Sequence, residues 1–473
     1  MKPAIVWFRE DLRLADNPAL HAACARGAPL VCLYLWDEDR SDHWSAGAAS
    51  RWWLHHALEA LAQSLSAHGG RLVLRRGSAA DVLKSVIAET GADAIYWNRC
   101  YAPYAMARDR ALKTAFAEQG IEVRSFPGNL LLEPWELTTQ EGRPFRVFTP
   151  FLKALRQSHV PAPLPRPRRL HFAPAIGSEP LTAWSLVPQA PNWAATWSQY
   201  WVPGESGALR RLKEFLERDL SAYALSRDWP ARAGTSRLSP HLHFGEISAR
   251  QIWHAQALTE SGHEKFLSEL AWREFSWHLL FHHPQLPEQP LDSRFSRFGW
   301  RTDATGLALW QRGQTGIPIV DAGMRQLWNT GWMHNRVRMI AASFLVKHLL
   351  IDWQDGARWF WDTLVDADLA NNSASWQWVA GCGADAAPYF RIFNPVLQGQ
   401  RFDPQGDYVR YFVPELARLP DRFVHSPWLA PAPVLDAANI KLGSSYPRPL
   451  VDLAAGRERA LLAFARLKGI GKA

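Results

Sequence analysis

Residues 1–36, MKPAIVWFREDLRLADNPALHAACARGAPLVCLYLW, decide the fold of the N-terminal part of the chain. They hold the first two of five short runs of β-branched and aromatic residues, which are Ile5–Phe8, Leu30–Trp36, Leu72–Arg75, Ala94–Trp97 and Val123–Phe126. Stretches with helical periodicity alternate with these runs, for example Ala48–Ala67 and Ala79–Thr90. Such alternation builds βαβ units around a parallel sheet. The sequence therefore predicts a Rossmann-like α/β domain over residues 1–130.

The texture of the sequence changes twice after this domain. Residues 131–203 are rich in proline, which disfavours long helices and central strands, so we expect an interdomain linker with a helix at Phe148–Gln157. From residue 204 to residue 473 apolar residues recur with a period near 3.6, which predicts a larger all-helical domain. The expected helices are Ala208–Asp219, Pro240–Ala257, His263–His283, Ala322–Trp328, Arg336–Leu350 and Ala357–Leu364.

Composition narrows the class of protein. The 473 residues carry a net charge of +8 without a basic tail, so a polyanionic partner is only mildly favoured. Four cysteines without a C-x-x-C pair suggest neither disulfides nor a metal site, and no signal peptide or membrane span is apparent. We therefore expect a cytoplasmic protein. The 25 tryptophans are unusual, because indoles stack well on flat rings.

Motif searches exclude some enzymes and leave four polar clusters. The sequence has no P-loop, H-E-x-x-H or G-x-S-x-G motif, which removes the main support for an ATPase, a zinc protease or a serine hydrolase. In Gly234–Pro240 we expect Ser239 to cap a helix that begins at Pro240, next to hydroxyls and an arginine suited to phosphate. Taken alone, this pattern fits an ordinary capped helix equally well.

The other clusters also permit two interpretations each. Asp366–Asn372 holds two carboxylates and two amides, which suit a polar turn or the edge of a heteroaromatic ring. Arg336 and Arg338 lie two positions apart, so they point differently, one toward a carboxylate and one toward phosphate. Glu269 and Trp272 share one helix face, as a surface glutamate beside a core tryptophan would.

Taken together, these clusters match a known family. The chain resembles DNA photolyases of the cryptochrome/photolyase family over residues 3–460. The matching stretches are VWFREDLRLADNPAL, GTSRLSPHLHFGEIS, LSELAWREF, GWMHNRVRM, DADLANN and WQWVAGCGADAAPYFRIFNP. The resemblance implies a light-driven repair enzyme that splits cyclobutane pyrimidine dimers by electron transfer from photoexcited reduced FAD. A cryptochrome-type photoreceptor with the same flavin site is the alternative.

The resemblance assigns FAD to the helical domain. Its implied binding residues are Tyr223, Thr235, Ser236, Arg237, Leu238, Ser239, Arg338, Asp366, Asp368 and Asn372. Asn372 lies near N5 of the flavin in this assignment and is also counted as catalytic. Its amide can present either oxygen or nitrogen to the ring, while Arg338 paired with Asp366 would fix one wall of the site.

The substrate residues follow from the same resemblance, which requires the lesion to flip out of the duplex. Glu269 is the implied catalytic donor to the dimer and should be protonated, as burial beside an aromatic ring would favour. The implied contacts with the lesion and DNA are Arg227, Trp272, Asn335, Arg336, Met339, Trp378 and Gln398. Relatives that repair (6-4) photoproducts typically carry histidines where Asn335 and Met339 stand, so cyclobutane-dimer repair is favoured.

An electron path and a second chromophore complete the expectations. The resemblance implies a tryptophan triad of Trp376 next to the flavin, Trp353 in the middle and Trp300 at the surface. A second antenna chromophore, a folate or a deazaflavin, is also expected in this family, but Tyr104–Ala105 replaces the usual Asn-Glu folate clamp. A folate, a deazaflavin and an empty antenna site are therefore all compatible with the sequence. The expected partner is DNA with pyrimidine dimers, bound by a monomer away from membranes.

Overall fold

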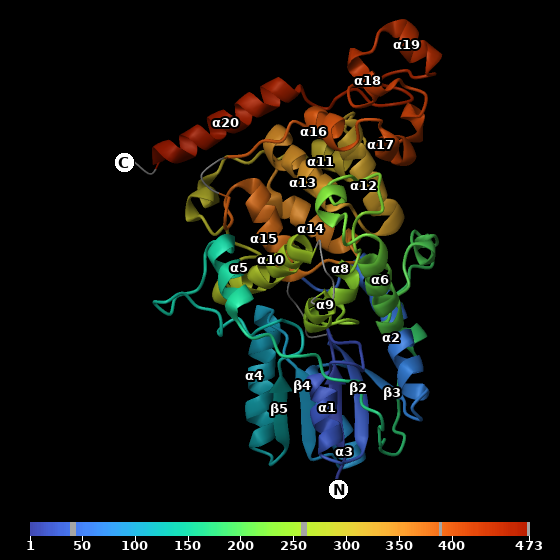
Figure 1. The fold of residues 1–473 in the computed structure, drawn as a ribbon, viewed down its shortest axis with the longest axis vertical. Coiled ribbons are helices and arrows are strands. Elements are labelled where there is room, and N and C mark those ends of the chain that lie inside the picture. Colours follow the sequence, from blue (N-terminus) through green and yellow to red (C-terminus); the bar gives the residue numbers. More distant parts are fainter. Residues whose placement is uncertain (38–43, 257–262, 387–389, 471–473) are drawn as a thin grey trace. The chain divides into compact units, whose positions relative to one another are not determined.

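The computed structural model describes residues 1–37, 44–256, 263–386 and 390–470. The chain forms two compact units, each built from several segments. The first unit comprises Met1–Ser221, Ser236–Pro284 and Val365–Asp368. The second comprises Ala222–Thr235, Gln285–Leu364 and Leu369–Ala473. Figure 1 labels the helices and strands in chain order.

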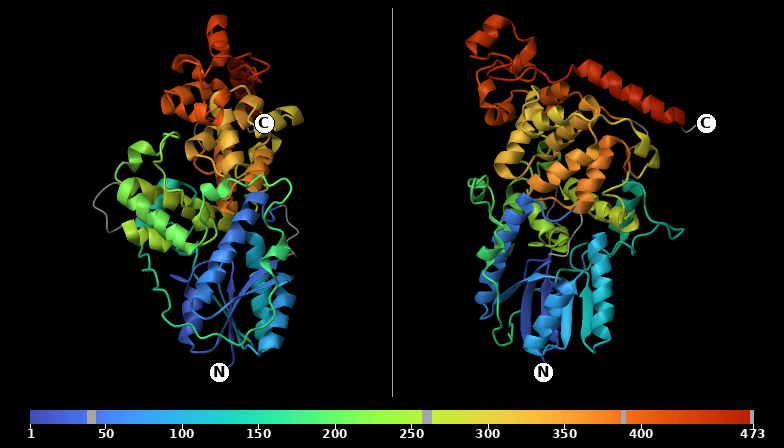
Figure 2. Two further views of the ribbon diagram at one scale, coloured as in Figure 1. Left: turned by 90° about the vertical axis from the view of Figure 1, so that its right-hand side faces the viewer. Right: turned by 180° about the vertical axis from the view of Figure 1, so that it is seen from behind.

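A five-stranded parallel sheet forms the base of the first unit, with the strand order β3-β2-β1-β4-β5. Its strands are β1 (Ala4–Phe8), β2 (Leu30–Asp37), β3 (Leu72–Gly77), β4 (Ala94–Asn98) and β5 (Glu122–Phe126). The connecting helices are α1 (Pro18–Ala25), α2 (Ala48–Ser66), α3 (Ala79–Thr90) and α4 (Pro103–Ala117). Figure 2 shows helices on both sides of the strands. The predicted α/β fold is confirmed, and every predicted strand lies within two residues of an observed one.

The proline-rich segment returns to the sheet. Helix α5 (Phe148–Gln157) has the predicted bounds, and two 3₁₀ turns, η1 (Leu181–Trp184) and η2 (Trp197–Gln199), follow it. Before these turns, the Leu30 N–H donates to the His171 carbonyl at 2.7 Å and the Ala173 N–H donates to the Leu30 carbonyl at 3.0 Å. The segment is therefore fastened to the first unit by backbone hydrogen bonds.

Four further helices belong to the first unit, namely α6 (Glu205–Arg218), α8 (Ser239–His243), α9 (Ala249–Gln256) and α10 (His263–His282). The single helix expected over Pro240–Ala257 was wrong, because the chain turns between α8 and α9; Ala257 itself lies outside the described residues. Gly245 has a φ of +62°, and a Cβ there would lie 2.0 Å from the Glu10 carbonyl oxygen. Glycine avoids both the strain and the clash, so the turn depends on it.

The regular elements of the second unit, over the described residues, are helices. They are α7 (Tyr223–Ser226), η3 (Ser293–Arg297), α11 (Ala304–Gln311), α12 (Pro318–Thr330), α13 (Asn335–Ser343), η4 (Phe344–Leu349), α14 (Trp353–Thr363), α15 (Leu369–Ala380), α16 (Pro395–Phe402), α17 (Asp407–Phe412), η5 (Pro414–Leu416), α18 (Asp421–Val424), η6 (Pro427–Leu429), α19 (Ala432–Ala437) and α20 (Leu453–Ile470). The mostly helical C-terminal part is confirmed. Among the described residues, no helix has the length and apolar character that a membrane span requires.

The helix expected over Arg336–Leu350 is a composite. It changes from α-helix to the π-helical segment η4 and ends at Leu350, whose φ is +61°. The buried Lys347 lies in η4, where its ammonium donates to the Ala380 carbonyl at 2.6 Å and sits 3.1 Å from the centroid of the Phe390 ring. A buried lysine needs a hydrogen-bond partner, and here that partner comes from another part of the chain. The apolar periodicity of this stretch gives no sign of such a contact.

Candidate functional site

The start of α8 is tied to the acidic segment in the first unit. The Ser239 hydroxyl donates to Asp366 Oδ2 at 2.6 Å, and the Trp277 indole N–H donates to Asp368 Oδ2 at 3.1 Å. The expectation that Ser239 caps the helix was wrong, because the N-cap position is Leu238 and it makes no side-chain capping bond. The Ser239 hydroxyl instead donates a charge-assisted hydrogen bond to a carboxylate. Three predicted residues, Ser239, Asp366 and Asp368, are thus fixed by direct hydrogen bonds.

Arg237 stands out in the loop before α8. Its φ of +50° is uncommon for a residue with a side chain, and such strain gathers at binding sites. Burial lowers the pKa of its guanidinium, and the like charge of Arg211 lowers it further. An anionic group would offset this repulsion. Together with the neighbouring Ser236 hydroxyl, these donors fit the phosphates of a nucleotide cofactor.

Trp272 on α10 is held by a stacked aromatic neighbour. Its ring lies 3.7 Å from the centroid of Phe148 at an interplanar angle of 9°, and Phe275 packs edge-on at 5.9 Å. Phe148 covers one face of the indole, so only the other face is left for a further flat ring. The sequence did not indicate Phe148 as a partner, because it lies on α5, in a different segment of the chain.

Glu269 lies one helical turn before Trp272, as predicted, but its surroundings differ from expectation. Its carboxylate pairs with Lys265 at 3.3 Å, and 27% of the side chain is exposed. Glu269 is therefore half-buried, and its expected protonation stays a prediction. The buried glutamate of α10 is Glu274, which accepts from the Arg273 guanidinium at 2.6 Å and from the Leu131 N–H at 2.7 Å. Burial raises the pKa of Glu274 to about 7.

A small pocket of the first unit also opens at Asp368. Its walls come from loops after the sheet strands and from α8 and α10. The lining residues are Glu10, Tyr101, Asn129, Leu130, Leu242, His243, Arg273, Trp277 and Asp368. The mixture of aromatic and charged walls suits part of a polar, planar ligand.

In the second unit, two predicted DNA contacts meet at one acidic residue. Asp228 accepts from Arg336 at 2.9 Å and lies 3.8 Å from Arg227. The Arg336 guanidinium also lies 4.4 Å from the centroid of the Phe402 ring. Asp228 was not predicted, although its position directly after Arg227 is a weak signal for an ion pair. This carboxylate holds the two guanidinium groups side by side, which suits two adjacent phosphates.

The rest of the α13 motif has mixed exposure. Asn335 is exposed at the start of the helix, while Met339 is half-buried one turn later. The Arg338 Nε–H donates to the Met333 carbonyl at 2.7 Å, which fixes the direction of that side chain. Its expected pairing with Asp366 would join the two units and stays a prediction.

Asn372 on α15 is buried, and its amide has a defined orientation. The Nδ2 atom donates to the Ala357 carbonyl at 3.0 Å. This hydrogen bond uses one of the two N–H groups, so the amide oxygen and the second N–H are left to face a ligand, as an acceptor and a donor. Gln398 on α16 has a half-buried side chain, and its buried Oε1 has no hydrogen-bond partner among the described residues.

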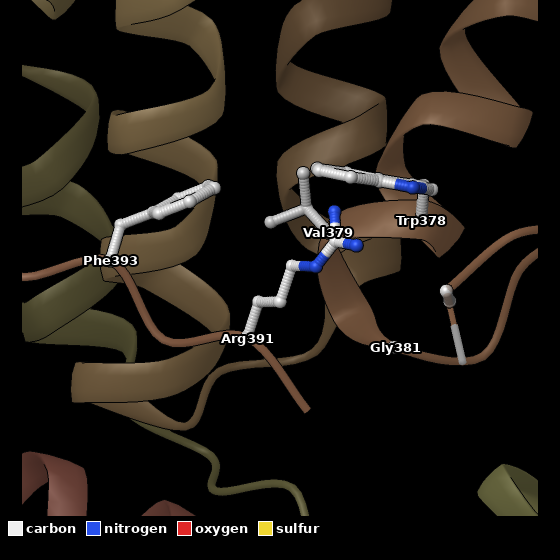
Figure 3. Close-up of a pocket in the computed structure, with 6 residues that line it drawn as sticks. Trp378, Val379, Gly381, Arg391 and Phe393 are labelled. Atoms are coloured by element: carbon white, nitrogen blue, oxygen red, sulfur yellow. The ribbon is translucent and has the colours of Figure 1, made fainter. Parts of the chain in front are cut away.

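Trp378 lines a pocket of the second unit, shown in Figure 3. The guanidinium of Arg391 lies 5.3 Å from the centroid of its ring, and Phe393 lies across the pocket. The remaining walls are Val379, Gly381 and Ala386. A cation over an indole is attractive, and Arg391 adds positive charge beside a predicted substrate contact. Nothing in the sequence pattern indicated this pairing.

The three predicted triad residues occupy connected elements of the second unit. Trp376 packs against α14 at Gly356, three residues after Trp353. The Arg301 N–H, next to Trp300, donates to the Leu350 carbonyl at 2.7 Å, shortly before α14 begins. Trp376 and Trp353 are 2% and 3% exposed, whereas Trp300 is partly exposed. Two buried residues and a partly exposed third fit a path that ends at the surface, and the steps between them stay a prediction.

Two other predicted residues lie in the second unit near its boundary in the chain. Tyr223 is buried, and the Arg227 guanidinium lies 5.4 Å from the centroid of its ring. Thr235 is the last residue of this segment and is joined directly to Ser236 in the first unit. Their approach to the phosphate-binding loop stays a prediction.

Comparisons with known proteins identify the class of protein to which the chain belongs. A family model described as "DNA photolyase" matches residues 4–168, and one described as "FAD binding domain of DNA photolyase" matches residues 266–466. The fold and the site thus define a flavin-binding protein of photolyase architecture. The deoxyribodipyrimidine photo-lyase of Agrobacterium fabrum is 52% identical over 98% of this chain and 98% of that protein.

Two further relatives complete the comparison. Cryptochrome-1 of Arabidopsis thaliana is 41% identical over 96% of this chain and 69% of that protein. The crystal structure of a bacterial class III photolyase from Agrobacterium tumefaciens is 51% identical, with a TM-score of 0.96 over 99% of this chain and 98% of that chain. The chain belongs to the cryptochrome/photolyase family, which confirms the resemblance found in its sequence.

Proposed function

We infer that this chain is a light-driven DNA-repair enzyme, a deoxyribodipyrimidine photo-lyase that splits cyclobutane pyrimidine dimers. The observation that carries this conclusion is the 52% identity to a protein of that name over 98% of both chains. The match to a solved class III photolyase at a TM-score of 0.96 supports it. The cofactor is FAD, in agreement with the FAD-binding family model.

We propose that the chain holds FAD through the donors and acceptors described above. Ser236, Arg237 and Ser239 would bind the phosphates, and the crowding of Arg237 with Arg211 supports an anion there. Tyr223, Thr235, Leu238, Arg338, Asp366 and Asp368 complete the proposed binding set. The amide oxygen of Asn372 would accept a hydrogen bond from a protonated ring nitrogen, while its Nδ2 keeps the hydrogen bond to the Ala357 carbonyl. Bound FAD would supply one electron to the lesion after light absorption and take it back after the bonds open.

The substrate side of the proposal rests on Trp272, Trp378 and Glu269. Trp272 offers one indole face, and Trp378 carries Arg391 beside it, so both suit stacking against flipped bases. In its protonated form, Glu269 would donate a hydrogen bond to the carbonyl of the dimer, which gains negative charge when the electron arrives. Its Lys265 partner would add positive charge near the same position. Arg227 and Arg336 would bind phosphates, with Asn335, Met339 and Gln398 as further contacts.

The tryptophan triad serves a separate step in this proposal. Trp376, Trp353 and Trp300 would pass electrons inward when the oxidised cofactor is photoreduced. Indoles suit this role because they are oxidised more easily than the other side chains around them. Repair itself would not consume these electrons, since the electron lent to the lesion returns.

The oligomeric state, the DNA partner, the cellular location and the second chromophore are also part of the proposed function. We propose that the chain acts as a monomer on DNA that contains dimers and that it works in the cytoplasm. A folate or a deazaflavin is the proposed class of second chromophore. The absorption spectrum of the material released by denaturing the purified protein distinguishes these two from FAD alone.

The experiment that tests the function is illumination of the flavin-loaded protein with an oligonucleotide that contains one cyclobutane dimer. We expect intact pyrimidines in the light and none in the dark, measured by separation of the products. Glu269→Ala should keep the flavin but lower the yield of repair, and exposed Glu118→Gln on the N-terminal unit serves as the matched control. A protein that binds and photoreduces flavin without repairing DNA would instead be a photoreceptor of the cryptochrome type.

A further inference from the structure

Helix α2 of the first unit carries three metal-ligating side chains within little more than one turn. His55 Nε2 lies 3.3 Å from Glu59 Oε1, and His56 Nδ1 lies 3.0 Å from Glu59 Oε2. One ligand atom from each of the three residues lies within 4.8 Å of the other two. None of the three belongs to the proposed flavin, lesion or electron-transfer residues.

The separations match the coordination geometry of a small divalent ion. Zinc binds imidazole nitrogen and carboxylate oxygen at about 2.0–2.2 Å, so ligand atoms at the tetrahedral angle lie roughly 3.3 Å apart. The two nitrogen-to-oxygen distances on α2 are already close to that value. The two nitrogens lie beside different oxygens of the same carboxylate, so the three side chains already converge on one place beside the helix. Two histidines and a glutamate are also a ligand set that zinc uses in proteins.

The ligands are held in place before any ion binds. Only 13% of the His55 side chain is exposed. The His56 ring packs edge-on against Trp52 with centroids 4.7 Å apart, and Trp52 packs against Trp197 at 5.3 Å. Side chains fixed in this way lose little conformational freedom on binding.

We propose that His55, His56 and Glu59 form a binding site for one divalent transition-metal ion of the zinc class on α2. The three protein ligands leave a fourth position for water. Imidazole and carboxylate ligands favour this class over calcium and magnesium, which prefer oxygen alone. Because the ion would join two consecutive turns of α2, it would stabilise the folded state of the first unit by binding.

The test is a calorimetric titration of the untagged, flavin-loaded full chain with zinc chloride after treatment with a chelator. We expect one zinc ion per chain and a rise of the thermal unfolding midpoint. His55→Ala and His56→Ala should each weaken binding by about tenfold or more, since each removes one of three protein ligands. Glu59→Gln tests the third ligand with a side chain of the same shape, in case a histidine variant folds poorly.

The matched control is His21→Ala, because His21 is an exposed histidine on α1 outside the cluster. It should bind zinc as the unchanged protein does. Equal zinc affinity in all variants would mean an adventitious ion only and would overturn the site. Absence of binding would mean that the three side chains form a hydrogen-bonded cluster alone. Both outcomes leave the repair reaction untouched, because none of these residues takes part in it.

Discussion

Two tryptophans of the candidate site have opposite surroundings, although both lie on helices. Trp272 of α10 stacks on Phe148 and keeps one face uncovered by that ring. Trp376 of α15 is 2% exposed and is enclosed by Phe360 at 5.0 Å, Trp310 at 6.2 Å and the backbone of Gly356. The Trp272 side chain is thus partly exposed, whereas neighbours in its own unit cover almost all of the Trp376 side chain.

The difference separates two roles that the same residue type serves in one protein. A side chain that meets a substrate must remain accessible on one face, while a side chain that only passes electrons can be packed completely. The immediate support also differs, because hydrogen bonds to His278 hold α10 one to two turns beyond Trp272, whereas aromatic rings pack directly around Trp376. This contrast predicts different responses to substitution and to pH.

Replacement of Trp376 by phenylalanine should give the largest effect. We expect photoreduction of the oxidised cofactor to fall to the level of a dark control, because phenylalanine is much harder to oxidise than an indole. Repair by protein that was reduced chemically beforehand should remain. Flavin absorption during illumination measures the first, and product analysis measures the second. Trp184→Phe in the first unit is the control, and equal photoreduction in both variants would contradict the path.

Truncation of Trp272 should have the opposite result, because it should weaken DNA binding and leave photoreduction of the cofactor unchanged. Loss of one stacking face costs about 1–3 kcal/mol per base, so Trp272→Ala should weaken binding of dimer-containing DNA by roughly tenfold or more. Photoreduction should not change. Trp272→Phe keeps a flat ring on Phe148 and should recover much of the affinity, measured by a filter-binding or fluorescence titration. If Trp272→Ala bound lesions normally, the open face would have no part in recognition.

The next largest effect is expected for a substitution of Gly356, which should change the free energy of unfolding. A Cβ at this position would lie 2.1–2.7 Å from three atoms at the far edge of the Trp376 indole. Gly356→Ala should therefore lower the free energy of unfolding by about 1–3 kcal/mol, despite the better helix propensity of alanine. Phenylalanine lacks those three atoms. In the Trp376→Phe background the same substitution should cost little, and additive losses in denaturant unfolding would argue against the close contact.

The elements of the fold could be predicted wherever a local pattern decides them. The five strands follow from separate apolar runs, and α3 and α5 have the predicted bounds. The breaks in two predicted helices could not be foreseen in the same way. The chain turns at Gly245, where the Glu10 backbone passes too close for a side chain. The π-helical segment η4 forms where Lys347 reaches the Ala380 carbonyl. Both causes are contacts between segments that are remote in sequence.

The same limit applies to the site. Motif resemblance indicated Trp272, Arg336 and Trp378, because these residues stand in long matching stretches. Their partners Phe148 and Asp228 lie on other segments, and Arg391 follows Trp378 later in the same matching stretch, but no spacing rule connects any of the three pairs. Glu269 shows a further limit, since its position on the helix was predicted but its exposure depends on the packing around α10.

The smallest expected effect is a pH dependence of stability on the side of Trp272. His278 of α10 accepts a hydrogen bond from the Phe145 N–H at Nε2, 3.0 Å away, and its Nδ1 lies 3.2 Å from the Pro134 carbonyl. Only the neutral imidazole with its proton on Nδ1 satisfies both partners. Burial, together with the nearby His282, lowers the pKa of His278 to about 4.

Because this pKa is lower in the folded than in the unfolded chain, the unfolded state binds more protons between about pH 6.5 and pH 4. Stability should therefore fall as the pH falls through this window, by about 1 kcal/mol between pH 7 and pH 5.5. His278→Gln keeps an acceptor for Phe145 but cannot titrate, so the decline in its urea midpoint should be smaller by that amount. The exposed His21→Gln should decline as the unchanged protein does. Identical slopes in all three would show that the two hydrogen bonds do not hold His278 neutral, and α10 would then be no more sensitive to acid than the apolar packing around Trp376.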